Sequence, residues 1–191
     1  MLANAPRPFR QGDLDGLCGA YAVVNAVRLA ALRHRRLRHA ACAHLFAELV
    51  DELAEAGRLR DRVTSGMGRR SVARLLRRAK VWLDVEYELR LEVGRPFRKR
   101  DEPDPGACLR LLAGHLGRAG TSAAIVATEG HWTVVQAVRG GRLLLADSHD
   151  RHYFLVAKAF GDEAAPSRLH LAGTFLLGVA SPNRLARRAA S

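Results

Sequence analysis

Hydrophobic residues recur at helical spacing through much of the first half of the chain. Residues 17–33 are apolar around most of a helix circumference, which predicts a buried central helix. A leucine stripe predicts a second helix over 40–56, with Gly57 as its C-terminal cap. A basic helix with one apolar face is expected over 65–79, and a further helix over about 105–118, where a proline suits the first position.

The apolar pattern changes to a period of two in later parts of the chain. Strict alternation over 81–91 predicts a strand, whereas three prolines and many charges over 94–106 predict a surface loop. Hairpin-sized turns separate some of the later apolar runs. The later predicted strands cover 121–128, 132–138, 142–148, about 152–158 and 168–179.

This order of elements predicts an α+β fold in which helices pack on an antiparallel sheet in two layers. The 191 residues suit a single domain, with a mainly helical lobe over 9–120, a mainly β lobe over 121–181 and a basic tail over 182–191. With 48% hydrophobic and 26% charged residues, the chain has enough apolar material for a core. No run of 18 apolar residues occurs, so no membrane span is expected.

The net charge of +12 suggests an acidic partner, nucleic acid or a membrane surface. The cations are 28 arginines and 3 lysines, a bias that a GC-rich genome produces without selection for binding. Nucleic acid, which the arginines of 33–38, 69–78 and 95–100 would contact, is the less favoured partner because tryptophan and tyrosine total only five. An acidic protein or peptide remains a candidate partner.

Three cysteines, Cys18, Cys42 and Cys108, are too few and too widely spaced for a disulfide framework. A reducing compartment is therefore expected. Residues 1–10 contain two prolines and no apolar core of a Sec signal, which favours a cytoplasmic location and leaves export by another route open. Cys42 and Cys108 lie on apolar helix faces and are interpreted as core residues.

Cys18 is the first candidate for chemistry. A loop rich in glycine and aspartate runs into the apolar helix, and Cys18 lies in its first turn. The positive end of the helix dipole and the unpaired N–H groups there favour a thiolate, which is the nucleophilic form of cysteine. Gly16 and Gly19 would leave room beside the sulfur for a substrate. A small buried residue at a helix start is the structural alternative.

His131 and Asp147 are the second and third candidates. His131 follows a tight turn at Gly130 and opens a strand, and Asp147 ends the next strand. If these strands pair across the turn at 139–141, the two side chains become neighbours, and the acid fixes the histidine tautomer. Trp132 could shield the Cys–His pair, line a groove or pack in the core.

Other histidines give weaker signals. His149 and His152 flank Asp150 and suggest a metal site, but no second ligand cluster accompanies them, so no metal is expected. Either could instead replace His131 as the base. The remaining histidines have no partner pattern and are interpreted as structural or solvated: His34, His39, His44, His115 and His170.

The order Gln11, Cys18, His131, Asp147 resembles that of the papain-like cysteine peptidase superfamily. In its compact size and in having aspartate as the third member, the chain most resembles the leader-peptide-processing domains of bacteriocin exporters. The dipeptide Leu17-Cys18 and the following Asn25 resemble the corresponding part of Josephin-type deubiquitinases. The resemblance covers roughly residues 9–30 and 121–150.

This resemblance implies a papain-like fold and a thiol hydrolase that cleaves a peptide or isopeptide amide without a cofactor. Cys18 would be the nucleophile, His131 the acid and base, Asp147 its orienting partner, and Gln11 a donor to the oxyanion. Gly16, Gly19, Gly130 and Trp132 would contact the substrate. Transglutaminases, deamidases and acyltransferases use the same chemistry with another acceptor and remain alternatives, as does a non-catalytic basic binding module.

Overall fold

The computed structural model describes residues 6–12, 15–97, 104–117, 121–160 and 166–181. Its helices are α1 (Cys18–Ala30), α2 (His39–Glu55), α3 (Leu59–Ser65), α4 (Arg69–Tyr87), α5 (Pro105–Leu116) and α6 (Val156–Phe160), with a 3₁₀ turn η1 (Leu171–Gly173). Its strands are β1 (Arg90–Gly94), β2 (Ser122–Thr128), β3 (His131–Arg139), β4 (Arg142–Leu145), β5 (Tyr153–Leu155) and β6 (Phe175–Ala180). The basic tail over 182–191, considered above, lies outside the described residues.

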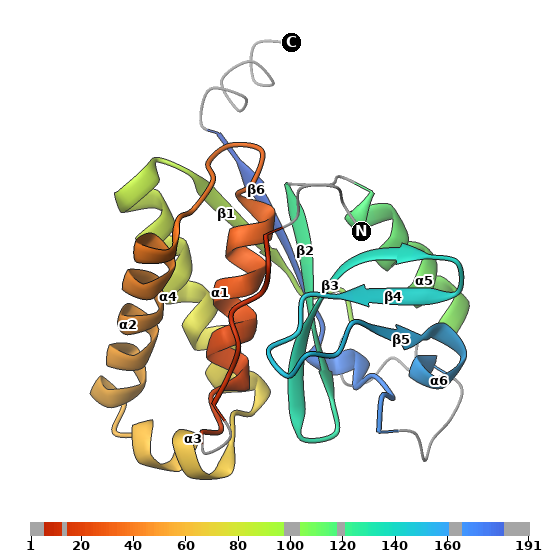
Figure 1. Cartoon of the computed structure of the whole chain (residues 1–191), viewed down its shortest axis with the longest axis horizontal. Helices are drawn as coiled ribbons and strands as arrows, with labels where there is room; N and C mark the ends of the chain where they lie inside the picture. Colours follow the sequence, from red (N-terminus) through yellow and green to blue (C-terminus); the bar gives the residue numbers. More distant parts are fainter. Residues whose placement is uncertain (1–5, 13–14, 98–103, 118–120, 161–165, 182–191) are drawn as a thin grey trace.

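The strands form one antiparallel sheet in the order β1-β6-β2-β3-β4-β5 (Figure 1). The fold is therefore α+β, as predicted. Its layering differs from the prediction, because helices cover both faces of the sheet. One core cluster joins α1, α2 and α4 to the sheet, and a second joins α5 and α6 to the other face. A two-layer arrangement would have left that second apolar face in contact with water.

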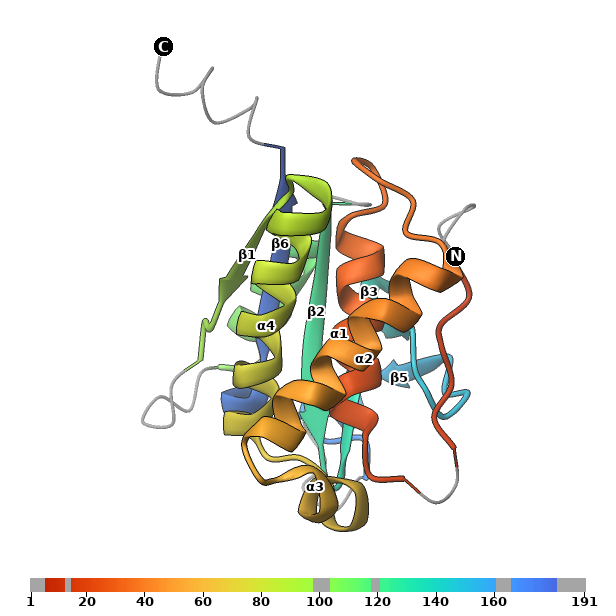
Figure 2. The same ribbon diagram turned by 90° about the vertical axis from the view of Figure 1, so that its left-hand side faces the viewer.

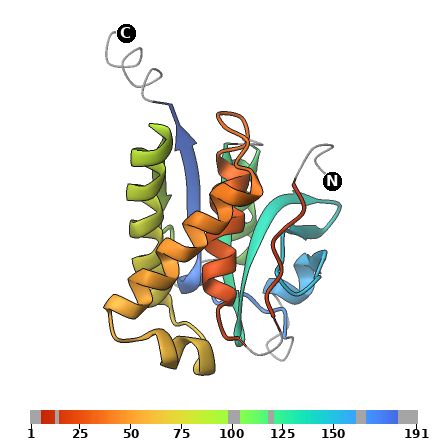
Figure 3. The same cartoon turned by 60° about the vertical axis from the view of Figure 1, so that its left-hand side comes forward.

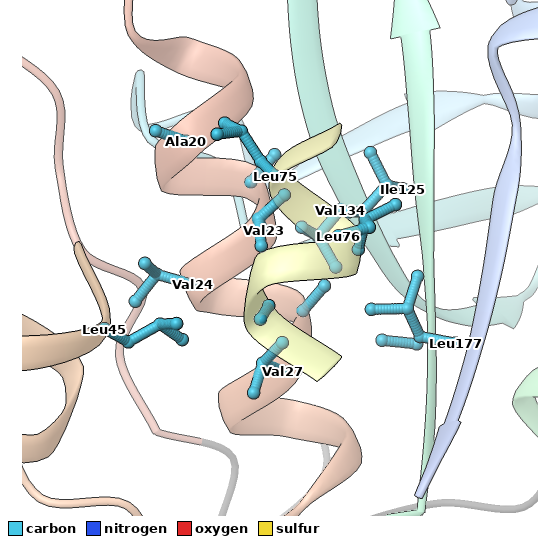
Figure 4. Close-up of a cluster of buried hydrophobic side chains, with 14 of the residues drawn as sticks. Ala20, Val23, Val24, Val27, Leu45, Leu75, Leu76, Ile125, Val134 and Leu177 are labelled. Carbon is cyan, nitrogen blue, oxygen red and sulfur yellow. The ribbon is translucent and has the colours of Figure 1, made fainter. Parts of the chain in front are cut away.

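The first core is built around α1, which is apolar on nearly all sides. Figure 4 shows Val23, Val24 and Val27 of this helix among side chains from α2, α4 and the sheet. Leucines at intervals of four along α2 contribute the next layer. This packing on several sides holds α1 against β2 and β3, so that its first residue has a defined position near the sheet.

The segment 81–91 is the largest error of the sequence prediction. It is helical up to Tyr87, and only Arg90–Gly94 forms a strand. Trp82 and Leu83 are buried and continue the helical face, whereas Val81 and Val85 are 54% and 73% exposed. The alternating apolar residues therefore do not share a buried face, and the period of 3.6 residues determines the structure. Glu88 ends the helix in the left-handed conformation, with φ of 53°.

Other predicted boundaries shift by a few residues. The basic helix begins at Arg69 rather than at residue 65, and the short helix α3, which has no buried residue, was not predicted. Strand β4 ends at Leu145, the predicted strand over 152–158 is split into β5 and α6, and η1 interrupts 168–179. The first half also contributes β1 to the sheet, so the helical and β parts are not separate in space. None of the described helices has the length and apolar character needed to cross a membrane.

Candidate active site

Cys18 is the first residue of α1. The loop before it is shaped by the Asp15 carboxylate, which accepts hydrogen bonds from the backbone N–H groups of Leu17 (3.0 Å) and Gly12 (3.1 Å). Leu17 is the N-cap residue of α1 and makes no side-chain capping hydrogen bond. At this position the backbone N–H of Cys18 has no acceptor within the helix. The residue is 5% exposed.

His131 opens β3 directly after the turn that joins it to β2. Thr128 and His131 are paired, so the turn has two residues, and Gly130 adopts φ of 70°, a conformation that favours glycine. Gly130 therefore has a clear role in the turn. The imidazole of His131 is 7% exposed at this end of β3.

Asp147 lies just beyond β4, and its side chain is fully buried. One of its oxygens, Oδ2, is 2.8 Å from Nε2 of His131. The other, Oδ1, accepts a hydrogen bond from the backbone N–H of His149 at 2.7 Å. The hairpin pairing of β3 with β4 therefore brings the histidine and the acid together, as the sequence predicted, and two contacts fix the carboxylate.

The Cys18 side chain lies close enough to the imidazole of His131 to raise the pKa of that ring. Because Nε2 binds Asp147, Nδ1 is the nitrogen left to face the sulfur. The three residues come from the start of α1, the start of β3 and the loop after β4, elements that Figure 3 shows beside one another. The predicted grouping of Cys18, His131 and Asp147 is present in the structure.

The electrostatics of this group favour a protonated imidazole. Burial alone would lower the pKa of His131, but the hydrogen bond to Asp147 and the nearby Cys18 side chain, together with the negative charges of both groups, outweigh it and raise the pKa from 6.5 to about 9. For Asp147, burial opposes ionisation, but the hydrogen bond and charge of His131 lower its pKa. The Thr133 hydroxyl, which lies nearby without reaching hydrogen-bonding geometry, also contributes to this lowering. At neutral pH the pair is therefore imidazolium and carboxylate.

Gln11 forms hydrogen bonds with the segment next to Asp147 and with the loop before Cys18. Its backbone N–H donates to the carbonyl of Ser148 at 3.1 Å, and its side-chain Nε2 donates to the carbonyl of Asp15. One N–H of the side-chain amide is thereby used, and the second is left for another acceptor. The predicted role of Gln11 as an oxyanion donor stays a prediction.

Gly16 is packed against Arg62 and Gly66, and Gly19 is packed against Met67 and Val72. A Cβ at Gly16 would lie 2.7 Å from the carbonyl oxygen of Arg62, and one at Gly19 would lie 2.9 Å from Val72. Both glycines therefore allow a close approach within the protein, whereas their contact with a substrate stays a prediction.

Trp132 also contacts Met67. Its indole N–H donates to the carbonyl of Met67 at 2.6 Å, and the residue is 6% exposed within the first core cluster. Core packing is thus the role of Trp132 that the structure supports, and the Trp132–Met67 bond links β3 to the loop between α3 and α4.

His149 was considered as an alternative base. His131 is the histidine that binds Asp147, and the ring of His149 lies against that of His131 with centroids 4.6 Å apart. Potential ligand atoms of His131, Asp147 and His149 all lie within 4.8 Å of one another, so these three residues could hold a metal ion. His152 is not part of this group.

Two further residues near the site, Thr133 and Asn25, were given no role from the sequence, although Asn25 is part of the resemblance described above. Thr133 lies two positions after His131 on β3, and the period of two in a strand could have placed it on the same face. The Asn25 side chain exchanges two hydrogen bonds with the backbone of Phe9, at 2.8 and 3.1 Å, and so holds the segment that leads to Gln11. Asn25 and Phe9 are 16 positions apart, and no sequence pattern indicates that they are in contact.

A scan against protein-family models gives no match for this chain, and a search of curated proteins gives none either.

Proposed function

We propose that the protein is a thiol hydrolase that cleaves a peptide or isopeptide amide in a protein substrate through Cys18, His131 and Asp147. The observation that carries this proposal is one buried imidazole that lies 2.8 Å from a buried carboxylate and close enough to a cysteine at a helix N-terminus for that cysteine to raise its pKa. We also infer a papain-like fold, since the nucleophile opens a central helix that packs on an antiparallel sheet.

In the first half of the reaction, the Cys18 thiolate attacks the amide carbon and forms a tetrahedral adduct. The C–N bond then breaks as the protonated His131 gives its proton to the leaving amine, which yields a thioester on Cys18. The raised pKa of His131 supplies this proton at neutral pH. Asp147 keeps the imidazole aligned and stabilises its positive charge.

In the second half, neutral His131 removes a proton from water, which attacks the thioester and releases the acid and the thiolate. The negative oxygen of both adducts needs donors that are already in position. The backbone N–H of Cys18 and the second N–H of the Gln11 amide are the candidates. A reducing cytoplasmic compartment would keep the thiol available for this cycle.

The experiment that tests this function measures cleavage of a panel of fluorogenic peptide amides and of ubiquitin-type isopeptide substrates. Wild type is expected to cleave at least one member, and Cys18→Ser is expected to abolish turnover. Cys42→Ala, which removes a buried thiol on α2, serves as the matched control and should retain activity. Added EDTA should leave the rate unchanged, because every proposed proton transfer uses a side chain of this chain.

Retained turnover in Cys18→Ser would overturn the proposal. Loss of turnover with EDTA would instead favour metal chemistry at His131, Asp147 and His149. Product analysis with an added primary amine distinguishes hydrolysis from acyl transfer.

A further inference from the structure

A second candidate binding feature lies away from the triad, where α4 meets the strand at one edge of the sheet. Figure 2 shows α4 beside β1 and β6. A pocket of about 280 Å³ opens between them. Its apolar part includes Leu76, Val93 and Phe175, and its charged part consists of Arg77, Lys80 and Arg95. We call it the α4–β1 pocket.

The cations of α4 fall into two sets. On the side facing α2, Arg74 is paired with Glu52 and Arg78 with Glu48. By contrast, the three cations of the α4–β1 pocket form no ion pair with any residue that the structure describes. The guanidinium of Arg95 lies 5.7 Å from the centroid of the Phe175 ring, which holds this charge at the pocket. The pocket therefore has an excess of positive charge that an acidic ligand would neutralise.

The apolar part of the pocket and the adjoining strand favour a peptide as that ligand. Val93 on β1 is 38% exposed, although it is a large apolar side chain. Among the described strands, β1 pairs with β6 alone, so its other edge can accept an extended peptide by backbone hydrogen bonds. Phe175 is 1% exposed and so cannot stack on a base, which makes single-stranded nucleic acid a poorer fit.

The pocket is also connected to the triad through two aromatic rings. Phe175 has its ring centroid 6.1 Å from that of Trp132, and Trp132 directly follows His131. A ligand in the pocket would thus contact Phe175, whose ring packs against Trp132, the neighbour of His131.

We propose that the α4–β1 pocket binds an extended acidic segment of the substrate, whose carboxylates face Arg77, Lys80 and Arg95 while an apolar side chain contacts Val93. This inference rests on the proposed function, because it gives the hydrolase a site for holding its substrate outside the triad. Binding at such a site raises the local concentration of the scissile bond and does not change the chemistry at Cys18.

The test measures binding by fluorescence anisotropy to the catalytically silent Cys18→Ser protein. The probe is a short fluorescein-labelled peptide of alternating glutamate and valine, and a serine–valine peptide is the uncharged comparison. Arg77→Glu with Lys80→Glu is expected to weaken binding of the acidic probe by at least about tenfold, since two favourable charge pairs are replaced by repulsion. Arg33→Glu with Arg36→Glu, two exposed arginines before α2, changes the net charge equally and should weaken binding far less.

Equal weakening by both pairs of substitutions would show attraction by net charge alone and would overturn the inference. The inference would also be overturned if the acidic peptide did not bind, at low salt, to the Cys18→Ser protein in which Arg77 and Lys80 are unchanged. Tighter binding of a single-stranded oligonucleotide than of the acidic peptide at Arg77 and Lys80 would overturn it as well. Because binding is read without turnover, these results are independent of whether Cys18 is a nucleophile. Conversely, Arg77→Glu with Lys80→Glu should leave alkylation of Cys18 in the otherwise wild-type chain unchanged.

Discussion

His131 connects the two other members of the site through its two ring nitrogens. Nε2 lies 2.8 Å from the buried Asp147 carboxylate, and the other nitrogen is available to Cys18. Buried imidazoles ordinarily lose their proton because burial disfavours the charged form. Here the flanking acid and sulfur reverse that effect, so the charge on His131 depends on its neighbours rather than on solvent.

At the scale of single residues, the variant Asp147→Asn tests whether the charge on His131 depends on the neighbouring carboxylate. The amide can still accept a hydrogen bond, but it carries no charge, so the pKa of His131 should fall well below its wild-type value of about 9. NMR titration of the His131 ring measures this change. Turnover should fall by about 10²- to 10⁴-fold. Asp150→Asn, which removes an exposed partner of Arg10, is the control and should change neither quantity; an unshifted His131 in Asp147→Asn would contradict the account.

At the scale of elements, the site depends on short connections that fix register. The two-residue turn at Glu129 and Gly130 places His131 at the start of β3, and pairing with β4 places Asp147 beside it. These turns are local in sequence, which is why the pairing of His131 with Asp147 could be predicted. The contacts of segment 62–68 with Gly16 and Trp132 join residues far apart in the chain, and no periodicity encodes them.

The continuation of α4 to Tyr87 shows a second limit of predicting secondary structure from the hydrophobic pattern. Alternation of valine and leucine over 81–91 satisfies a strand pattern, yet the helical face of Leu76, Ala79 and Leu83 is what the core buries. Two periods coexist in this segment, and tertiary packing decides between them. The layer formed by α5 and α6 was missed for a related reason, since the order of elements does not state which face of the sheet a helix covers.

Leu83→Ala and Val85→Ala test this assignment, because both positions would face one way in a strand. In the helix Leu83 is fully buried and Val85 is 73% exposed. Leu83→Ala should therefore cost about 2–5 kcal/mol of unfolding free energy, and Val85→Ala within about 0.5 kcal/mol of zero. Denaturant unfolding followed by circular dichroism gives both values, and similar losses for the two variants would argue for a strand.

At the scale of the whole molecule, the triad is held where the sheet meets a helix that is buried on most sides. Cores on both faces of the sheet fix β2 and β3, and α1 packs directly on these strands. The titration of His131 is therefore coupled to the stability of the fold. Because its pKa is raised on folding, its contribution is fully present below pH 6.5 and is lost as pH rises through about 9.

Thermal and denaturant unfolding between pH 6 and 10 should show this loss as about 3 kcal/mol, which corresponds to the rise in pKa from 6.5 to about 9. Other groups also titrate in this range, so the informative quantity is the difference between wild type and His131→Gln. This difference should shrink as the pH rises from about 6.5 to about 9 and stay small above that. A difference that stays constant across the range would mean that His131 is not charged in the folded protein.

The most direct test of the central claim is the rate at which iodoacetamide alkylates Cys18 near neutral pH, followed by intact mass and peptide mapping. Cys42 and Cys108 are 1% and 0% exposed, and burial raises the pKa of both thiols, so they should remain unmodified in the folded chain. Cys18 is expected to react faster than free cysteine and at least about tenfold more slowly in His131→Ala. Reactivity of Cys18 equal to that of free cysteine, and unchanged in His131→Ala, would contradict an activated nucleophile at this site.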